Sequence, residues 1–189
     1  LSAVEAGDME TAQRMVLEAA KLAMPDTKIV DDNGNPLVVW RASRYGKTTD
    51  YTVFEKDKTG GRGFFFTNKQ SAIERYGGEN LRAFFLNITN PDVSNDFNVL
   101  QAEEKYTPDN DGVIFAPDGI EGINYEVKAF ESSQIKSAEP VTYDDNGNVI
   151  PLSERFNPEN SDIRFSTRTD EQREALFDKA KAQFGLTNN

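Results

Sequence analysis

The chain has 189 residues, of which 37% are hydrophobic and 28% charged, and its formal net charge at pH 7 is -11. This size suits one packed domain with an extension, and the negative charge argues against nucleic acid or an anionic membrane as a partner. Cysteine and histidine are absent, which excludes disulfides, thiolate nucleophiles, Cys/His zinc sites and Ser-His catalysis.

An N-terminal helix is predicted first. Apolar residues recur at steps of three and four up to Met24, Asp8 can cap a helix that begins near Met9, and Pro25 ends it. Residues 1–25 are therefore predicted to be a helical extension. The chain opens at Leu1 without an initiator Met or a signal sequence, which we interpret as a piece excised from a longer protein. No hydrophobic run approaches the ~20 residues of a membrane helix.

Short β-rich runs bounded by Gly, Pro, Asn or Asp follow this helix. The runs are Lys28–Val30, Pro36–Arg41, Gly63–Thr67, Leu81–Ile88, Gly112–Phe115 and Tyr125–Phe130. Lys69–Tyr76 is predicted to be a short helix, and Val93–Tyr106 is ambiguous, with helix as one possibility. These elements predict the α+β class, with strands that need no parallel crossovers.

Two turns and a C-terminal helix complete the predicted elements. Asp32–Asn35 and Asp145–Asn148 both read Asp-Asn-Gly-Asn before an extended apolar run, which predicts two tight hairpin turns. Asp170–Phe184 carries one apolar helical stripe and ends at Gly185. It is interpreted as a docking helix or a linker.

The acidic turn Asp109–Gly112 superficially resembles a calcium-binding loop. If Gly112 were position six of an EF-hand, Asp118 would stand at position twelve, where that loop requires Glu. The pattern fails, and we predict a solvated turn without a metal.

Three other units carry candidate chemistry. In the first, an apolar strand ends in Arg41, Ala42 and Ser43, and a guanidinium can bind phosphate through its planar fork; the alternative is an edge-strand Arg in solvent. In the second, Gly61–Asn68 has glycines that let a ligand approach, and Phe65 with Tyr76 could form a slot for a flat ring. Phe64 and Phe66 are assigned to the core.

The third unit is Asn124–Ser137. Its period-two alternation puts Glu126, Lys128 and Phe130 on one face of a strand and Val127 with Ala129 on the other. A Glu beside a Phe on such a face is unusual for a purely structural strand.

Together the three units resemble the ADP-ribosyltransferases, in particular the domains of phage and prophage polyvalent or MuF-type proteins, over Asp8–Ser166. Trp40–Ser43 is similar to the first motif of the branch shared with poly(ADP-ribose) polymerases and diphtheria toxin, and Gly63–Tyr76 to the second. Glu126 stands eight residues before Gln134, as the catalytic Glu does there. Arg41 replaces the His of that branch and Ala42 its Gly, although another branch uses Arg at this strand end.

The resemblance implies a fold and a site. The fold is an ADP-ribosyltransferase-like split antiparallel β-sandwich of about six short strands with flanking helices, in residues 26–166, followed by a C-terminal helix or linker in 167–189. Glu126 is the implied catalytic residue. The implied NAD-binding residues are Arg41, Ala42, Ser43, Phe65, Thr67, Ser71 and Tyr76. No metal is implied.

The implied activity is transfer of ADP-ribose from NAD to a protein acceptor. Cleavage of the nicotinamide bond passes through an oxocarbenium-like state that a carboxylate stabilises. Asn124 is not the Gln or Glu of arginine-modifying relatives, so an arginine acceptor is not supported. The resemblance further implies a phage- or prophage-encoded toxin that acts in the bacterial cytoplasm or is delivered to a target cell, with an immunity protein as partner. An NAD glycohydrolase and a non-catalytic binding domain of a virion protein are the alternatives.

Overall fold

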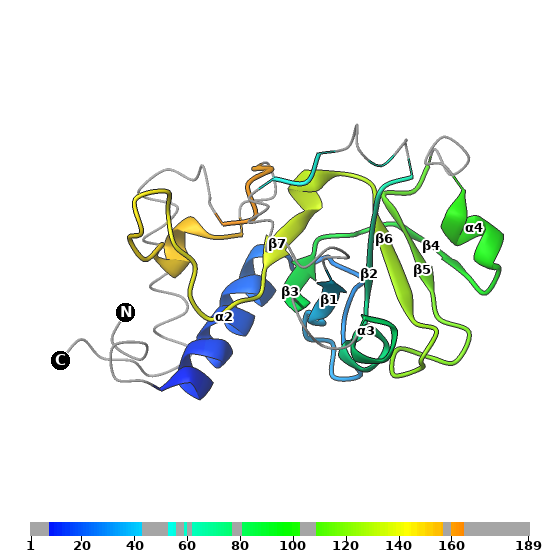
Figure 1. Cartoon of the computed structure of the whole chain (residues 1–189), viewed down its shortest axis with the longest axis horizontal. Helices are drawn as coiled ribbons and strands as arrows, with labels where there is room; N and C mark the ends of the chain where they lie inside the picture. The colour runs from blue at the N-terminus through cyan, green and yellow to red at the C-terminus, as the bar shows by residue number, and fades with distance from the viewer. Residues whose placement is uncertain are drawn as a thin grey trace.

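The computed structural model of the chain describes residues 8–42, 53–55, 59, 62–76, 81–102, 109–156 and 160–164. Within these residues seven strands form one sheet, in the order β4-β5-β6-β2-β1-β3-β7 (Figure 1). The strands are β1 Val39–Ala42, β2 Phe64–Thr67, β3 Leu81–Leu86, β4 Pro91–Ser94, β5 Gly112–Phe115, β6 Glu126–Ala129 and β7 Ile135–Ser137. The helices are α2 Met9–Ala23, α3 Lys69–Tyr76 and α4 Phe97–Gln101, with 3₁₀ turns η3 Ser132–Gln134 and η4 Leu152–Glu154. The predicted α+β class is confirmed.

The sheet consists of two halves. Among the described residues, one registered pair, Trp40 with Thr67, joins β1 to β2. By contrast, β1 is paired with β3 from Val39 to Ala42, and β2 is paired with β6 along its whole length. The resemblance implies a split sandwich, whereas the structure has one continuous sheet whose two halves are joined by this single registered pair, a junction that we call the split.

Three strand predictions need correction. The strands β4 and β5 are parallel, with Pro91 opposite Gly112, whereas antiparallel pairing was predicted throughout. Strand β4 ends within Val93–Tyr106, the segment that the sequence left ambiguous. It lies at the edge of the sheet, where its first residue, Pro91, is tolerated. Residues 28–30 form no strand and contribute one bridge, from Val30 to Pro36. Strand β7 was not predicted, and the predicted helix Asp170–Phe184 lies outside the described residues.

An aromatic core covers the face of the sheet formed by Val39, Phe64, Phe66, Phe84 and Val127. Phe54 lies across this core, with its ring centroid 5.3 Å from that of Phe64, 5.9 Å from that of Phe66 and 5.6 Å from that of Phe84. Phe64 and Phe66 are each 2% exposed. Their assignment to the core is confirmed.

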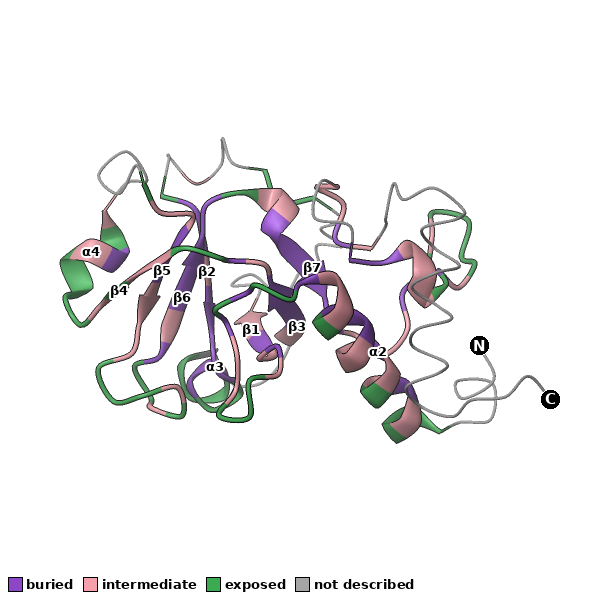
Figure 2. Cartoon of the chain, turned by 180° about the vertical axis from the view of Figure 1, so that it is seen from behind, coloured by how far each residue is buried: buried purple, intermediate pink, exposed green. Residues whose placement is uncertain are grey.

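Helix α2 covers the opposite face beside β3 and β7 (Figure 2). Its N-cap is Asp8, whose side chain accepts a hydrogen bond of 3.0 Å from the Thr11 amide. The buried side of the helix, which includes Val16 and Ala20, packs in one cluster with Phe85. The predicted N-terminal helix is confirmed, and its spacing of apolar residues is explained by this contact.

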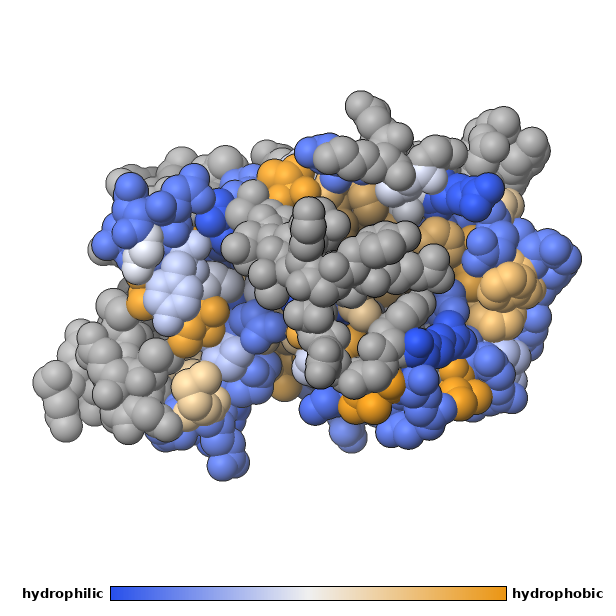
Figure 3. Space-filling model, in the orientation of Figure 1, coloured by the Kyte–Doolittle hydropathy of each residue, from blue (hydrophilic) through white to orange (hydrophobic). Residues whose placement is uncertain are grey.

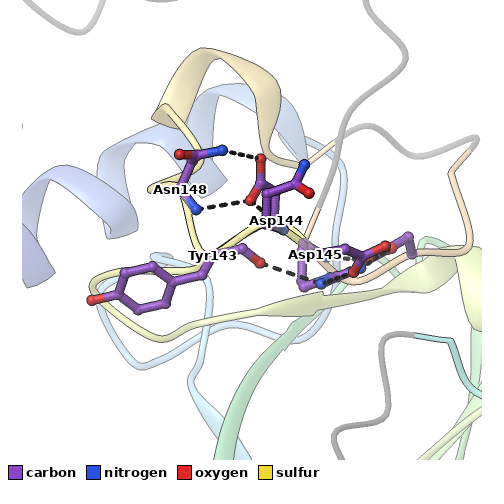
Figure 4. A network of polar contacts seen from close by, with 7 residues as sticks. Tyr143, Asp144, Asp145 and Asn148 are labelled. Carbon is purple, nitrogen blue, oxygen red and sulfur yellow. Dashed lines mark hydrogen bonds and ion pairs between the residues drawn. The ribbon is translucent and has the colours of Figure 1, made fainter.

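The two predicted hairpin turns have the same hydrogen-bond pattern, anchored one residue earlier than the predicted ranges. In the second turn Asp144 Oδ1 accepts from the amides of Asn146 and Asn148, both at 2.8 Å, and Oδ2 accepts from the Asn148 side chain at 2.9 Å (Figure 4). Asp31 makes the equivalent contacts in the first turn. These hydrogen bonds hold the pKa of both carboxyls below its usual value.

Gly63 occupies a position that only glycine fits well. Its φ is +80°, and a Cβ there would lie 2.5 Å from the Ala129 carbonyl oxygen. The neighbouring strand β6, and not a ligand, therefore makes the close approach at this glycine. We expect Gly63→Ala to lower the free energy of unfolding by about 3 kcal/mol, from positive φ and steric overlap together.

Gly34 offers the matched control for this prediction, which urea unfolding would measure. Its φ is +77°, but nothing lies within 4 Å of the added Cβ, so Gly34→Ala should lose only about 1 kcal/mol. Equal losses in the two variants would show that the approach of β6 to Gly63 does not limit the side chain.

Because Lys136 of β7 is buried, we expect the free energy of unfolding to rise at alkaline pH. The residue is 1% exposed, its ammonium donates to the Asn160 carbonyl, and burial lowers its pKa to about 8, against the opposing charge of Asp162. Between pH 8 and the ordinary value of 10.5 the unfolded chain therefore binds more protons than the folded chain. The contribution of Lys136 to stability should rise over this range, by at most about 1.4 kcal/mol per pH unit.

The variant Lys136→Met isolates this contribution from that of other titrating groups. In urea unfolding across this pH range, the stability of the parent should rise relative to that of Lys136→Met, because only the parent gains from losing a buried charge. Curves that stay parallel would contradict the prediction.

Candidate functional site

Glu126 begins β6, and its register places it beside the second unit of the sequence. It is paired with Thr67 of β2, and Thr67 is also paired with Trp40 of β1. Directly paired residues share one face of a sheet. The fold thus places Trp40, Thr67 and Glu126 side by side on one face, whereas Arg41 and Ala42 follow Trp40 along β1 in the direction away from Glu126.

The carboxylate of Glu126 is held by a cation from helix α3. Its Oε1 accepts a hydrogen bond from Nη1 of Arg75, and the two side chains are 15% and 33% exposed, respectively. Arg75 Nη2 also donates to the Ile123 carbonyl at 3.2 Å. Within the described part of the chain, Oε2 of Glu126 accepts no hydrogen bond.

Arg75 was missed in the sequence analysis. It lies four residues after Ser71 on α3, so both occupy the same side of the helix. That spacing, directly before Tyr76, is the signal that could have identified it.

The segment that leads into Glu126 is tied to the start of α3. Asn68 Nδ2 donates to the carbonyls of Ile120 at 2.9 Å and Gly122 at 2.8 Å. The hydroxyl of Ser71 donates to the Ile123 carbonyl at 2.7 Å. The sequence predicts no role for Asn68, although it ends the second unit. Its Oδ1 also accepts from the Ser71 amide at 2.8 Å, as at a helix N-cap.

Two of the predicted NAD-binding hydroxyls are used within the chain. Thr67 Oγ1 donates to the Tyr125 carbonyl at 2.5 Å, and Ser71 is fully buried. A ligand could reach the Ser71 hydroxyl only by displacing the segment before Glu126. In this arrangement both hydroxyls position that segment, and their contact with NAD stays a prediction.

Arg41 lies on the other face of the sheet from Glu126. It is paired with Arg82 and shares its face with the aromatic core, because Trp40, its neighbour along β1, shares the face of Thr67. Its Nη1 donates to the Phe65 carbonyl at 2.9 Å, and its guanidinium lies 5.6 Å from the ring centroid of Phe54. Arg41 thus bridges the split between β1 and β2, partly buried.

The other predicted NAD-binding residues are placed to different extents. Phe65 lies on the Glu126 face and is half-buried against the small core below α4. Ala42 is half-buried at the end of β1. Ser43 lies outside the described residues, as does the side chain of Tyr76, whose backbone ends α3.

The predicted alternation along β6 is confirmed. It places a buried lysine, Lys128, on the same face as Glu126. Lys128 is paired with Phe65 on the face of Glu126. Its ammonium is fully buried and donates to the carbonyls of Leu100 at 2.9 Å and Ala102 at 2.8 Å. Lys128 therefore caps the C-terminal end of α4, where a cation is favoured.

The surface near the pair carries scattered apolar side chains. Ile73 of α3 is 41% exposed and Ile123, whose carbonyl binds Arg75, is 49% exposed. On the face drawn in Figure 3, hydrophobic residues appear in small separate groups among hydrophilic ones. No helix of the described residues has the length and hydropathy of a membrane span, and the described Asp and Glu residues form no cluster of three or more suited to a metal ion.

Comparison with known proteins identifies one family. Residues 31–108 match the family model described as ADP-ribosyltransferase in polyvalent proteins, a segment that contains β1, β2 and α3 and ends before Glu126. Searches of curated proteins and of solved structures gave no match. The family uses NAD as its substrate, and its polyvalent members indicate a phage-associated origin. Over residues 31–108, less than half of its length, this chain is thus similar to the ADP-ribosyltransferases of polyvalent proteins.

Proposed function

We propose that the chain is an NAD-dependent ADP-ribosyltransferase that modifies a protein acceptor. The observation that carries the proposal is the position of Glu126. Its backbone is paired with that of Thr67 in β2, and its carboxylate is bound by Arg75 of α3. Thr67 and α3 both lie in the segment that matches the family. Glu126 lies outside the segment that matches the family, but it is bound to two elements, β2 and α3, that lie within that segment.

The chemistry requires a carboxylate beside the ribose of NAD. The bond between C1′ and the nicotinamide nitrogen breaks with its electron pair going to nicotinamide, and the ribose becomes oxocarbenium-like. Glu126 would stabilise this charge and accept a hydrogen bond from a ribose hydroxyl through Oε2. The acceptor nucleophile then attacks C1′ and loses its proton.

The remaining contacts to NAD are proposed from the family motifs. The backbone at Ala42 would bind the nicotinamide amide, and Tyr76 would stack on the ring. The contact of Arg41 with the NAD phosphates stays a prediction, because Arg41 shares the face of the aromatic core, opposite Glu126, and its guanidinium would have to leave the Phe65 carbonyl to bind an anion.

Radiolabelled NAD added to the purified chain with bacterial lysate tests the proposal. Label on protein, removed by protease but not by nuclease and absent with Glu126→Gln, is the expected result. Free ADP-ribose alone would identify an NAD glycohydrolase, and intact NAD would identify a non-catalytic binding domain. Either of these outcomes would refute the transferase activity.

We also infer a biological setting from the phage-associated family. The chain is proposed to act as a toxin in the bacterial cytoplasm, made there or delivered, and to be neutralised by an immunity protein. Induced expression in bacteria should arrest growth, whereas Glu126→Gln should not. Equal growth of both strains, with equal amounts of protein, would argue against the toxin role.

A further inference from the structure

Arg75 makes two contacts that end on the same short stretch of chain. Nη1 binds Oε1 of Glu126 and Nη2 binds the carbonyl of Ile123, three residues earlier. One guanidinium therefore connects the carboxylate to the backbone that precedes it. This fork geometry is specific to arginine, because lysine has a single nitrogen at its tip.

The helix that carries Arg75 is fixed to the same stretch of chain at its other end. Asn68 and Ser71 bind the carbonyls of residues 120, 122 and 123. Helix α3 and the segment before Glu126 are thus connected by hydrogen bonds from the first turn to the last. These hydrogen bonds fix the backbone of Arg75 relative to β6.

We propose that Arg75 is a positioning residue for the Glu126 carboxylate, a role that rests on the proposed function. It holds Oε1 and leaves Oε2, which accepts no hydrogen bond within the described chain, to the ribose of NAD. A hydrogen bond between two charged groups is stronger than a neutral one and fixes the carboxylate in one rotamer. The orientation of a reacting group makes a large contribution to rate, and a misplacement of ~1 Å can cost about 100-fold.

Two other roles for Arg75 make different predictions. A partly exposed ion pair that serves only stability contributes little and does not affect the folded enzyme's rate. A cation that binds the NAD phosphates changes KM. A positioning residue changes kcat, because the misplaced carboxylate meets the ribose only after NAD has bound.

The test measures kcat and KM for nicotinamide release with Arg75→Gln and Arg75→Lys. For Arg75→Gln we expect kcat to fall about 10- to 100-fold, with KM for NAD within about twofold of the parent value. Arg75→Lys should recover part of kcat, since it restores one charged donor. Glu74→Gln is the matched control, because Glu74 is the adjacent, exposed residue of α3, and within the described residues its carboxylate accepts a hydrogen bond from the Gln70 side chain at 2.5 Å.

A parent value of kcat in Arg75→Gln would overturn the proposal, and so would a rise in KM with kcat unchanged. The carboxyl ¹³C NMR signal of Glu126, assigned by its loss in Glu126→Gln, gives a reading without turnover. This signal should move in Arg75→Gln and return toward the parent position in Arg75→Lys. If the parent leaves NAD intact the proposed function fails, and an unmoved signal would separately overturn the contact between Arg75 and Glu126.

Discussion

Replacing Glu126 by Gln is expected to lower the rate of nicotinamide release from NAD by about 100- to 1,000-fold. The amide keeps the size of the side chain but removes the negative charge that faces the oxocarbenium-like ribose. It also leaves Arg75 without its anionic partner. Because the pair is partly exposed, the free energy of unfolding should change by less than about 1 kcal/mol.

Glu121→Gln is the control for this substitution. Glu121 is an exposed carboxylate in the segment before Glu126, so its loss changes the net charge equally without touching the pair. We expect parent rates for Glu121→Gln, measured by chromatography of released nicotinamide. A Glu126→Gln chain with the parent rate would remove Glu126 from the reaction.

Phe66→Ala should produce the largest loss of stability. Phe66 is 2% exposed, and its ring centroid lies 5.3 Å from that of Phe84 on the other half of the sheet and 5.9 Å from that of Phe54. Truncation would leave a cavity where the two halves meet. The expected loss in free energy of unfolding is about 3 to 5 kcal/mol, which corresponds to a fall in Tm of about 6 to 20 °C.

Phe97→Ala provides the comparison for Phe66. Phe97 is 52% exposed and has one ring contact among the described residues, with Phe115 at a centroid distance of 5.7 Å. Its loss should cost about 1 kcal/mol. Similar losses in the two variants, measured by urea unfolding, would contradict the assignment of Phe66 to a core that joins the halves.

The elements predicted correctly are those specified by neighbouring residues. Helix α2 has its own N-cap in Asp8, and both hairpin turns close on themselves through a single Asp. The missed strand β4 is short and polar, and it becomes a strand only through parallel pairing with β5. Strand β7 likewise depends on pairing with β3. Such pairings join residues that are distant in sequence, so the residues of the strand itself do not predict them.

The candidate site shows the same division. The alternation along β6 was predictable from period two, and it correctly grouped Glu126 with Lys128. The face of Arg41 relative to Glu126 was not predictable, because it depends on the pairing of Trp40 with Thr67 across the split. The contact of Arg75 with Glu126 requires both the β2–β6 register and the direction of α3, neither of which a single sequence specifies.

A structure of the chain with a non-cleavable NAD analogue tests the account most directly. We expect a hydroxyl of the nicotinamide ribose within roughly 3 Å of Oε2 of Glu126, with Arg75 still bound to Oε1. An analogue bound on the opposite face of β6, or one whose ribose lies beyond hydrogen-bond distance of Glu126, would contradict the proposed catalytic role of this carboxylate.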